Sequence, residues 1–258
     1  MPRFCANLSM MFNEVPFMER FAAAAAGFTA VEYLFPYDHD PAALRAALDA
    51  HGLTQVLFNA PPGDWSAGER GIACLPGRVA EFRAGMMRAL DYAAALGCRQ
   101  VPCMAGLAPA GLAPTTLAAV YATNLAWAAE QAEAAGVKLL IEPINHQDMP
   151  GYFLNTTDQA AGLIEAIGRE RLGLQFDLYH CQITEGDITR RMARLMPLID
   201  HMQIADVPAR NEPGSGEIGW EFVFARIDAL GYRGWVGCEY RPAGETVAGL
   251  AWRRRYGV

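Results

Sequence analysis

The chain has 258 residues, of which 52% are hydrophobic and 19% charged, and its formal net charge at pH 7 is -7. A chain of this length and composition can bury a large core, which argues against disorder. The negative net charge argues against a nucleic-acid partner, because proteins that bind polyanions usually carry a basic face.

Eight short apolar or β-branched runs recur along the chain and are predicted to be strands. They cover residues 3–9, 30–34, 54–60, 100–106, 138–144, 172–178, 199–206 and 234–240. The segments between them have apolar residues at three- and four-residue spacing, which predicts amphipathic helices. The clearest of these helical segments are 15–28, 40–52, 81–97 and 114–136. Each of the last three ends in a glycine that is separated from the next strand by one or two residues, as helix C-termini often do.

The alternation of eight strands with helices is typical of an α/β fold, a (β/α)8 TIM barrel with a parallel sheet. A doubly wound sheet is the competing architecture, but the sequence has neither GxGxxG nor GxxxxGK[ST], the phosphate loops that would favour it. Because no linker or low-complexity tract interrupts the pattern, we predict a single domain over residues 1–258. The connection 61–78 is too long for a plain β-to-α turn and is expected to be a lid or a binding loop.

Polar side chains stand near the ends of the last four predicted strands. Glu142 follows three apolar residues of the fifth strand, Asp177 follows LGLQF in the sixth, Gln203 lies in the seventh and Glu239 lies in the eighth. In a TIM barrel the C-terminal strand ends carry the catalytic residues. Three carboxylates that face one another repel unless a cation lies among them. Three carboxylates and an amide oxygen suit Mg²⁺ or Mn²⁺ rather than zinc or copper, so we predict a divalent metal site. The competing interpretation, that each acidic residue separately caps a helix or pairs with an arginine, requires the same coincidence on successive strands.

Such a site predicts a reaction class. A metal ion that chelates a carbonyl oxygen and the neighbouring hydroxyl oxygen acidifies the carbon-bound proton and stabilises the resulting enediolate. Two carboxylates can then remove that proton and return one at the neighbouring carbon. Glu142 and Glu239 come from the fifth and eighth strands and are expected on opposite sides of the barrel mouth. We therefore assign them as the acid/base pair as well as metal ligands.

Four further residues are candidates for contacting the substrate. His180 follows Asp177 by three residues and could orient the substrate or a metal-bound water, although a loop hydrogen bond is the competing interpretation. Arg210 and Glu212 lie in a loop bracketed by Pro and Gly that could bring a positive charge to an anionic substrate. For Arg210 the competing interpretation is a surface ion pair. Arg70, in the long loop 61–78, is a candidate for binding a substrate carboxylate. We expect His201 to be structural.

The cysteines and the N-terminus bear on the cellular location. The six cysteines form no CxxC pair and lack the regular density of a secreted disulfide scaffold, which predicts reduced thiols in a cytoplasmic protein. The N-terminal stretch is interrupted by Pro, Arg, Asn and Glu and is a poor signal peptide. No uninterrupted apolar run approaches the ~20 residues of a spanning helix, so we expect no membrane partner.

The chain also resembles the hydroxypyruvate isomerase family of xylose-isomerase-like barrels, nearly from end to end. The stretches that carry the resemblance are RFCANLSMMF, VEYLFPYD, AGERGIACLPGR, IEPIN, FDLYH, HMQIAD, EPGSGEI and GWVGCEY. The resemblance implies metal-assisted aldose–ketose chemistry that interconverts hydroxypyruvate and 2-hydroxy-3-oxopropanoate (tartronate semialdehyde). It implies that Glu142 and Glu239 are the catalytic glutamates and that these two bind the metal together with Asp177 and Gln203. Related sugar epimerases have histidine in place of Gln203, which groups this chain with the hydroxypyruvate isomerases.

Three alternatives stay open at this point. A sister group of 2-oxo-tetronate isomerases shares the ANLSMMF opening and the CEY ending but departs from the IEPIN and GERG forms, so hydroxypyruvate is the expected substrate and 2-oxo-tetronate, or another small sugar substrate, the alternative. A DNA-repair endonuclease of the same superfamily would need a basic groove and more histidine ligands. A binding protein without activity would have little use for two bases beside its ligand. Barrels of this family commonly associate, which implies a homo-oligomer but identifies no interface.

Overall fold

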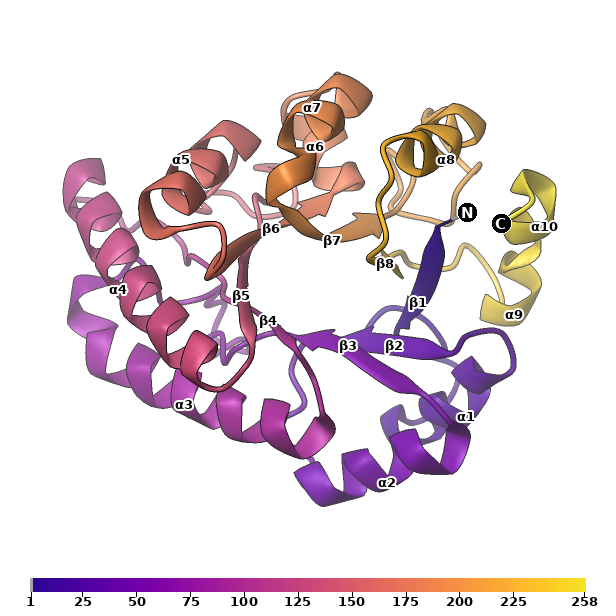
Figure 1. Ribbon diagram of the computed structural model, residues 1–258, viewed down its shortest axis with the longest axis horizontal. Helices are drawn as coiled ribbons and strands as arrows, with labels where there is room; N and C mark the ends of the chain where they lie inside the picture. The colour runs from indigo at the N-terminus through magenta and orange to yellow at the C-terminus, as the bar shows by residue number, and fades with distance from the viewer. Residues whose placement is uncertain (1) are drawn as a thin grey trace.

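Eight parallel strands form a nearly closed barrel in the computed structural model, which describes residues 2–258 (Figure 1). The strands are β1 (Arg3–Asn7), β2 (Ala30–Tyr33), β3 (Thr54–Phe58), β4 (Gln100–Pro102), β5 (Lys138–Ile141), β6 (Leu172–Asp177), β7 (Ile199–Ile204) and β8 (Trp235–Cys238). They are hydrogen-bonded in the order β3-β2-β1-β8-β7-β6-β5-β4. Between the two end strands, the backbone N–H of Ala60 donates to the carbonyl oxygen of Pro102 at 2.8 Å. The predicted TIM barrel is confirmed, and the doubly wound alternative is wrong.

Helices surround the barrel on the outside (Figure 1). They are α1 (Arg20–Ala25), α2 (Pro41–His51), α3 (Val79–Leu96), α4 (Pro114–Ala134), α5 (Thr157–Ile167), α6 (Leu178–Thr184), α7 (Ile188–Leu195), α8 (Trp220–Ala229), α9 (Thr246–Gly249) and α10 (Ala251–Tyr256), with short 3-10 helices at Phe17–Glu19, Pro76–Arg78 and Met196–Leu198. Gly52 and Gly97 end α2 and α3 in the left-handed conformation, with φ of 62° and 66°. Glycine adopts this conformation without the steric penalty of a Cβ atom.

Several strands are shorter than the apolar runs that predicted them. The run 100–106, for example, pairs as a strand only as far as Pro102. Ala105 instead forms an isolated antiparallel bridge with Gly71 of the long loop. Apolar residues that a loop buries are indistinguishable from strand residues in the sequence, because both are selected for burial rather than for ladder hydrogen bonds.

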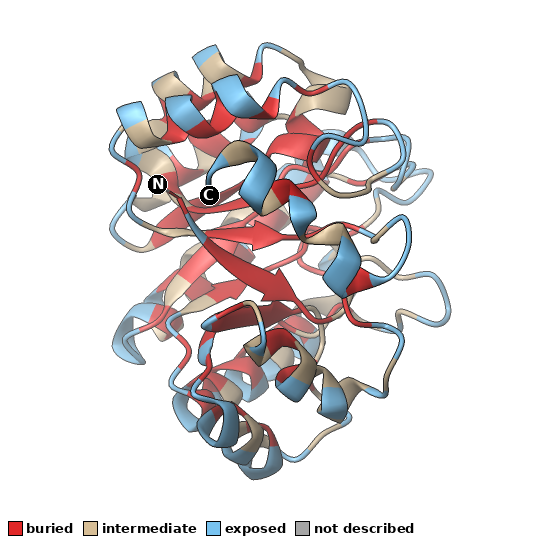
Figure 2. Cartoon of the chain, turned by 90° about the vertical axis from the view of Figure 1, so that its right-hand side faces the viewer, coloured by how far each residue is buried: buried red, intermediate tan, exposed pale blue. Residues whose placement is uncertain are grey.

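The strands lie buried between the outer helices, whose outward faces are exposed (Figure 2). Strands of parallel sheets usually read as continuous apolar runs, because both faces are covered. Several strand positions break this rule with buried polar side chains: Asn7, Glu32, Gln55, Gln175, Asp177, His201 and Gln203. Burying a polar group without a partner costs free energy, so these side chains need hydrogen-bond partners or a ligand inside the barrel or at its mouth.

Within residues 2–258, none of the helices combines the length and the apolar character that a membrane span requires. The six cysteines are buried, and none of them forms a disulfide in this part of the chain.

Candidate active site

Three carboxylates and one histidine meet at the C-terminal ends of β5, β6 and β8. Asp177 is the last residue of β6, His180 lies in α6 directly behind it, and Glu142 and Glu239 follow β5 and β8. One ligand atom of each side chain lies within 4.8 Å of the others, and all four residues are buried. The strand-end pattern of the sequence therefore brings its three predicted carboxylates to one point. Glu142 and Glu239 are close neighbours there rather than widely separated across the mouth.

Asp177 uses only one of its two carboxylate oxygens for local structure. Its Oδ1 accepts a hydrogen bond from the backbone N–H of Tyr179 at 2.8 Å and so caps the N-terminus of α6. Its Oδ2 is buried without a hydrogen-bond partner and lies 3.6 Å from Nε2 of His180. The helix-cap interpretation is thus correct for one oxygen, and the other remains available to a ligand.

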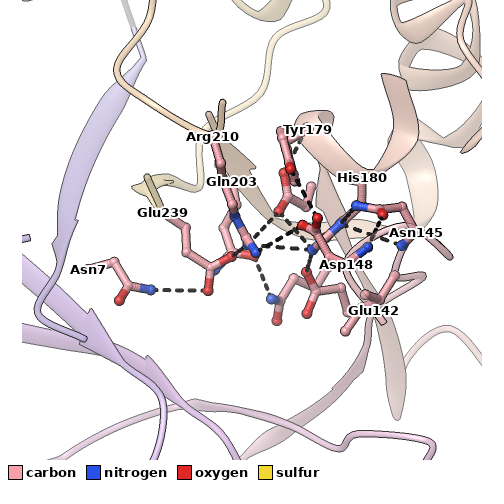
Figure 3. A network of polar contacts seen from close by, with 12 residues as sticks. Asn7, Glu142, Asn145, Asp148, Tyr179, His180, Gln203, Arg210 and Glu239 are labelled. Atoms are coloured by element: carbon pink, nitrogen blue, oxygen red, sulfur yellow. Dashed lines mark hydrogen bonds and ion pairs between the residues drawn. The ribbon is translucent and has the colours of Figure 1, made fainter. Parts of the chain in front are cut away.

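Arg210 supplies positive charge within the carboxylate cluster (Figure 3). Its Nη2 donates to Oε2 of Glu239 at 2.5 Å and lies 3.6 Å from Oδ2 of Asp177. Its guanidinium stands over the ring of Tyr179, 4.9 Å from the centroid, and its Nη1 lies 3.6 Å from Oδ2 of Asp148. The side chain is only 11% exposed, so this is a buried ion pair and the surface interpretation is wrong.

The carboxyl groups of the cluster hold their protons more tightly than usual. Burial, and then the negative charges of Glu239 and Asp177, raise the pKa of Glu142 well above its ordinary range. Burial also raises the pKa of Asp177 to about 6 and that of Glu239 to about 8, although Arg210 opposes both shifts. One guanidinium therefore does not compensate three carboxylates, and a dication would remove this penalty.

Asn145 determines which nitrogen of His180 carries the proton. Oδ1 of Asn145 accepts the backbone N–H groups of Gln147 at 2.9 Å and Asp148 at 2.8 Å. The amide nitrogen of Asn145 must therefore face Nδ1 of His180, which lies 2.6 Å away. Because an amide nitrogen only donates, Nδ1 accepts, and the neutral ring carries its hydrogen on Nε2.

The Nε2–H group of His180 points into the carboxylate cluster. It lies 3.8 Å from Oε1 of Glu142 as well as close to Asp177. Burial and then the charge of Arg210 lower the pKa of His180 well below its ordinary value, so the ring is neutral. In this tautomer His180 offers a hydrogen-bond donor to a ligand and no lone pair to a metal ion.

Gln203 is in register with Asp177 on the neighbouring strand and is held by two other side chains. Its Nε2 donates to Oε1 of Glu32 at 2.8 Å, and its Oε1 accepts from Nε2 of Gln175 at 2.5 Å. An amide oxygen has two lone pairs, so one remains for a further ligand.

A cavity of about 250 Å³ opens onto the cluster. Its walls include Glu142, His180, Arg210 and Glu239 together with Met10, Leu34, Asn59, Trp65, Arg70, Met104, Ile144, Asp148, Met149 and Arg241. A space of this size and polarity suits a small polar molecule.

Arg70 lines this cavity, and Glu212 does not. The guanidinium of Arg70 stacks on the ring of Trp65 at 3.9 Å and donates to the carbonyl oxygens of Trp65 and Glu69 at 3.2 and 2.7 Å. It forms no ion pair with any residue of the described part of the chain. Oε2 of Glu212 instead accepts the backbone N–H of Ala243 at 3.0 Å and ties two loops together. The position of Glu212 gives no support to a substrate contact.

Sequence reasoning missed a second buried polar cluster, formed by Cys5, Glu32 and His201. Nε2 of His201 lies 2.8 Å from Oε2 of Glu32, and both side chains are fully buried. Burial raises the pKa of Glu32, but His201, Gln203 and Asn7 outweigh it and lower the pKa overall. The signal was present, because Glu32 interrupts an apolar strand just as Glu142 follows one.

Comparisons with known proteins agree with this geometry. Residues 21–256 match the family described as "Xylose isomerase-like TIM barrel". The chain is 56% identical over 257 residues to the 2-oxo-tetronate isomerase of Cupriavidus necator, covering 99% of each chain. It is 48% identical over 257 residues to the hydroxypyruvate isomerase of Escherichia coli, covering 99% of this chain and 100% of the relative. A crystal structure from Brucella melitensis, described as an AP endonuclease of family 2, superposes with a TM-score of 0.96 at 49% identity and 99% coverage of both chains.

Proposed function

Because the chain belongs to the xylose isomerase-like TIM barrel family, we propose that its site moves a carbonyl group between adjacent carbons of a three- or four-carbon hydroxy-oxo acid. The enzyme is an isomerase, as its relatives are. The observation that carries the proposal is the buried group of Glu142, Asp177, His180 and Glu239, of which Glu142, His180 and Glu239 line a small polar cavity. Hydroxypyruvate, interconverted with 2-hydroxy-3-oxopropanoate, is the substrate that the sequence favours. The identity to a 2-oxo-tetronate isomerase makes that four-carbon acid the second candidate.

The donor set suits a hard divalent cation such as Mg²⁺ or Mn²⁺. Oε1 of Glu142 and Oδ2 of Asp177 are buried oxygens without a hydrogen-bond partner. A cation bound between them would satisfy both, which supports a metal site at this position. Glu142, Asp177, Gln203 and Glu239 would hold the ion. When bound, it supplies Lewis-acid polarisation of the carbonyl oxygen and the adjacent hydroxyl oxygen of the substrate.

The two glutamates divide the proton transfer. Oε1 of Glu142 would face the ion, so the second carboxylate oxygen of Glu142 would take the carbon-bound proton, whereas Glu239 is held by Arg210 and Asn7. The electron pair of the broken C–H bond forms the enediolate, Glu239 returns a proton to the former carbonyl carbon, and the hydroxyl proton passes to the former carbonyl oxygen, so that the hydroxyl carbon becomes the new carbonyl. Proton exchange with water then restores the starting states of the two glutamates. In the reverse direction the two residues exchange roles.

His180 and Arg70 act on the substrate's oxygens. The Nε2–H group of His180 faces the same space and can donate to the oxygen on which negative charge develops. Arg210 is already engaged by acidic side chains, whereas Arg70 bonds only to backbone carbonyls and a ring. Of these two arginines, Arg70 is therefore the one available for a bidentate contact with the substrate carboxylate.

Turnover in deuterated water tests the proposal directly. The protein is incubated with Mn²⁺ or Mg²⁺ and either hydroxypyruvate or 2-oxo-tetronate, and product formation and deuterium uptake at the substrate carbon are followed by NMR. We expect turnover by the parent and by Glu221→Gln, whose side chain is exposed on α8. Glu142→Gln and Glu239→Gln should fold and lose activity. Parental turnover by both variants, or a spectrum unchanged over hours with the parent, contradicts the assignment.

A DNA-repair endonuclease is the second candidate, because the similar Brucella structure carries that description. The net charge of -7 and a cavity of about 250 Å³ favour a small acid over a duplex. A gel shift with an abasic duplex separates the two functions, and we expect no retardation. We also propose that the protein is cytoplasmic and forms a homo-oligomer.

A further inference from the structure

Glu32 is a fully buried carboxylate that is absent from the cavity lining and contacts Gln203, a proposed ligand of the cation. Its Oε1 accepts from Nδ2 of Asn7 at 3.0 Å and from Nε2 of Gln203 at 2.8 Å. Its Oε2 faces Nε2 of His201 at 2.8 Å and accepts from Sγ of Cys5 at 3.3 Å. An ionised carboxylate has about four acceptor sites, and three hydrogen-bond donors and the facing imidazole of His201 surround this one.

The barrel is built to leave room for this carboxylate. Position 237 on β8 is glycine, and a Cβ atom there would come within 2.4 Å of both carboxylate oxygens of Glu32. Any other residue at this position would displace Glu32 or the strand. The space beside Gly237 is therefore filled by the carboxylate of Glu32.

Glu32 determines the orientation of the Gln203 amide. Because an ionised carboxylate only accepts, Gln203 must present its NH₂ group to Glu32 and its carbonyl oxygen to the other side. Gln175 donates to that oxygen and so supports the same orientation. Without Glu32 the amide could rotate by half a turn, and its NH₂ group would then replace the oxygen among the metal ligands.

A second link runs from Glu32 through Asn7 to Glu239. Figure 3 shows its second step, from Asn7 to Glu239. Oδ1 of Asn7 accepts the backbone N–H of Ser9 at 3.0 Å, so its amide nitrogen faces inward. That nitrogen donates to Glu32 and also lies 3.3 Å from Oε1 of Glu239. The orientation of Asn7 thus connects the deeper carboxylate to one of the two proposed proton-transfer groups.

We infer that Glu32 is a positioning residue, which holds Gln203 oxygen-first toward the cation site and, through Asn7, fixes the carboxylate of Glu239. The inference rests on the proposed function, because the cation site is the one proposed above. Residues that orient metal ligands from behind typically change metal affinity or activity by about 10- to 100-fold when they are replaced.

The test is the affinity for Mn²⁺, measured by calorimetry or by electron paramagnetic resonance on the unloaded protein. Glu32→Gln keeps the shape of the side chain but replaces one accepting oxygen with an NH₂ group. That group must face either Asn7 and Gln203 or His201 and Cys5, where an accepting oxygen stood before. We expect Mn²⁺ affinity to fall by about 10- to 100-fold. Glu32→Asp keeps the charge but moves the carboxylate away from Gln203, so it should lose less Mn²⁺ affinity. It provides a second test of the inference if Glu32→Gln does not fold.

Two further variants distinguish positioning from a general loss of structure. Gln55→Met removes a buried strand amide that bonds only to the backbone carbonyl of Leu57, so it should change thermal stability and leave Mn²⁺ affinity unchanged. The double variant Glu32→Gln with Gln203→Glu reverses donor and acceptor between the two side chains and should recover much of the lost affinity.

The outcomes separate this inference from the proposed function. Folded Glu32→Gln protein that binds Mn²⁺ within about twofold of the parent overturns the positioning role, whatever the parent's activity, since replacing a residue that orients a metal ligand should cost at least ~10-fold. Weaker Mn²⁺ binding by Glu32→Gln, together with a parent that turns over neither acid, leaves the positioning role intact and overturns the substrate assignment. A parent that binds no Mn²⁺ overturns both.

Discussion

Removal of the metal should make the protein lose stability as the pH rises from about 5 to about 8. In the metal-free protein, burial raises the pKa of Glu239 to about 8 from the ordinary value of 4.5, and that of Asp177 to about 6 from 3.8. Below the unfolded pKa, both the folded and the unfolded chain hold these protons. Between the unfolded and the folded pKa, the unfolded chain has released them and the folded chain has not. The free energy of unfolding therefore falls as the pH rises through this window.

The magnitude follows from the pKa of Glu239. At about 1.4 kcal/mol per pKa unit, its shift alone corresponds to a loss of about 5 kcal/mol by about pH 8. For a protein of this size, each kcal/mol changes Tm by roughly 2–4 °C, so Tm should drop by about 10–20 °C. Saturating Mn²⁺ stabilises the ionised carboxylates and should abolish most of this slope.

Thermal unfolding followed by circular dichroism, in EDTA and in Mn²⁺, measures the effect. Glu239→Gln removes the titrating group and should flatten the slope in EDTA, whereas Glu221→Gln, exposed on α8, should keep it. Metal-free stability that stays constant or rises across the window would refute the electrostatic argument. An unchanged slope in Glu239→Gln would assign the effect to other groups.

Two further predictions concern the substrate contacts. His180→Gln should lower kcat by about 10²- to 10³-fold, the usual effect of losing a donor to a developing oxyanion, while Mn²⁺ affinity stays within a few fold; a parallel loss of Mn²⁺ affinity would make His180 a metal ligand instead. Arg70→Met should raise KM for the acid by about 10- to 100-fold, because a hydrogen bond to a charged group contributes about 1.5–3 kcal/mol, and should change kcat much less. Steady-state kinetics with Arg70→Lys as the charge-conserving control checks this, and an unchanged KM in Arg70→Met would assign the carboxylate to another residue.

The fold and part of the site could be predicted because they depend on local pattern. Alternating strand and helix periodicity implies a parallel barrel, and a parallel barrel places the C-terminal ends of all strands at one edge. Glu142, Asp177 and Glu239 therefore had to meet once their strands were recognised, and the structure places them together. Arg70 was placed by the length of its loop, and it lines the cavity.

Other parts of the site could not be predicted, because they depend on which side chains from distant strands touch. The loop of Arg210 and Glu212 offered two charged candidates, and only the folded loop shows that one enters the carboxylate cluster while the other bonds to the backbone of Ala243. The tautomer of His180 depends on the amide orientation of Asn145, which two backbone N–H groups determine.

The sequence by itself determined the barrel, the order of its strands along the chain and the acidic character of its mouth, because these follow from the period of apolar residues and from the residues at strand ends. The tertiary structure alone decided the contacts of Glu32, whose partners Asn7 and Gln203 lie on other strands. It also decided the upward pKa shifts of Glu142 and Glu239. Both depend on burial and on distances of a few ångströms between residues far apart in the chain, and only closure of the barrel sets those distances.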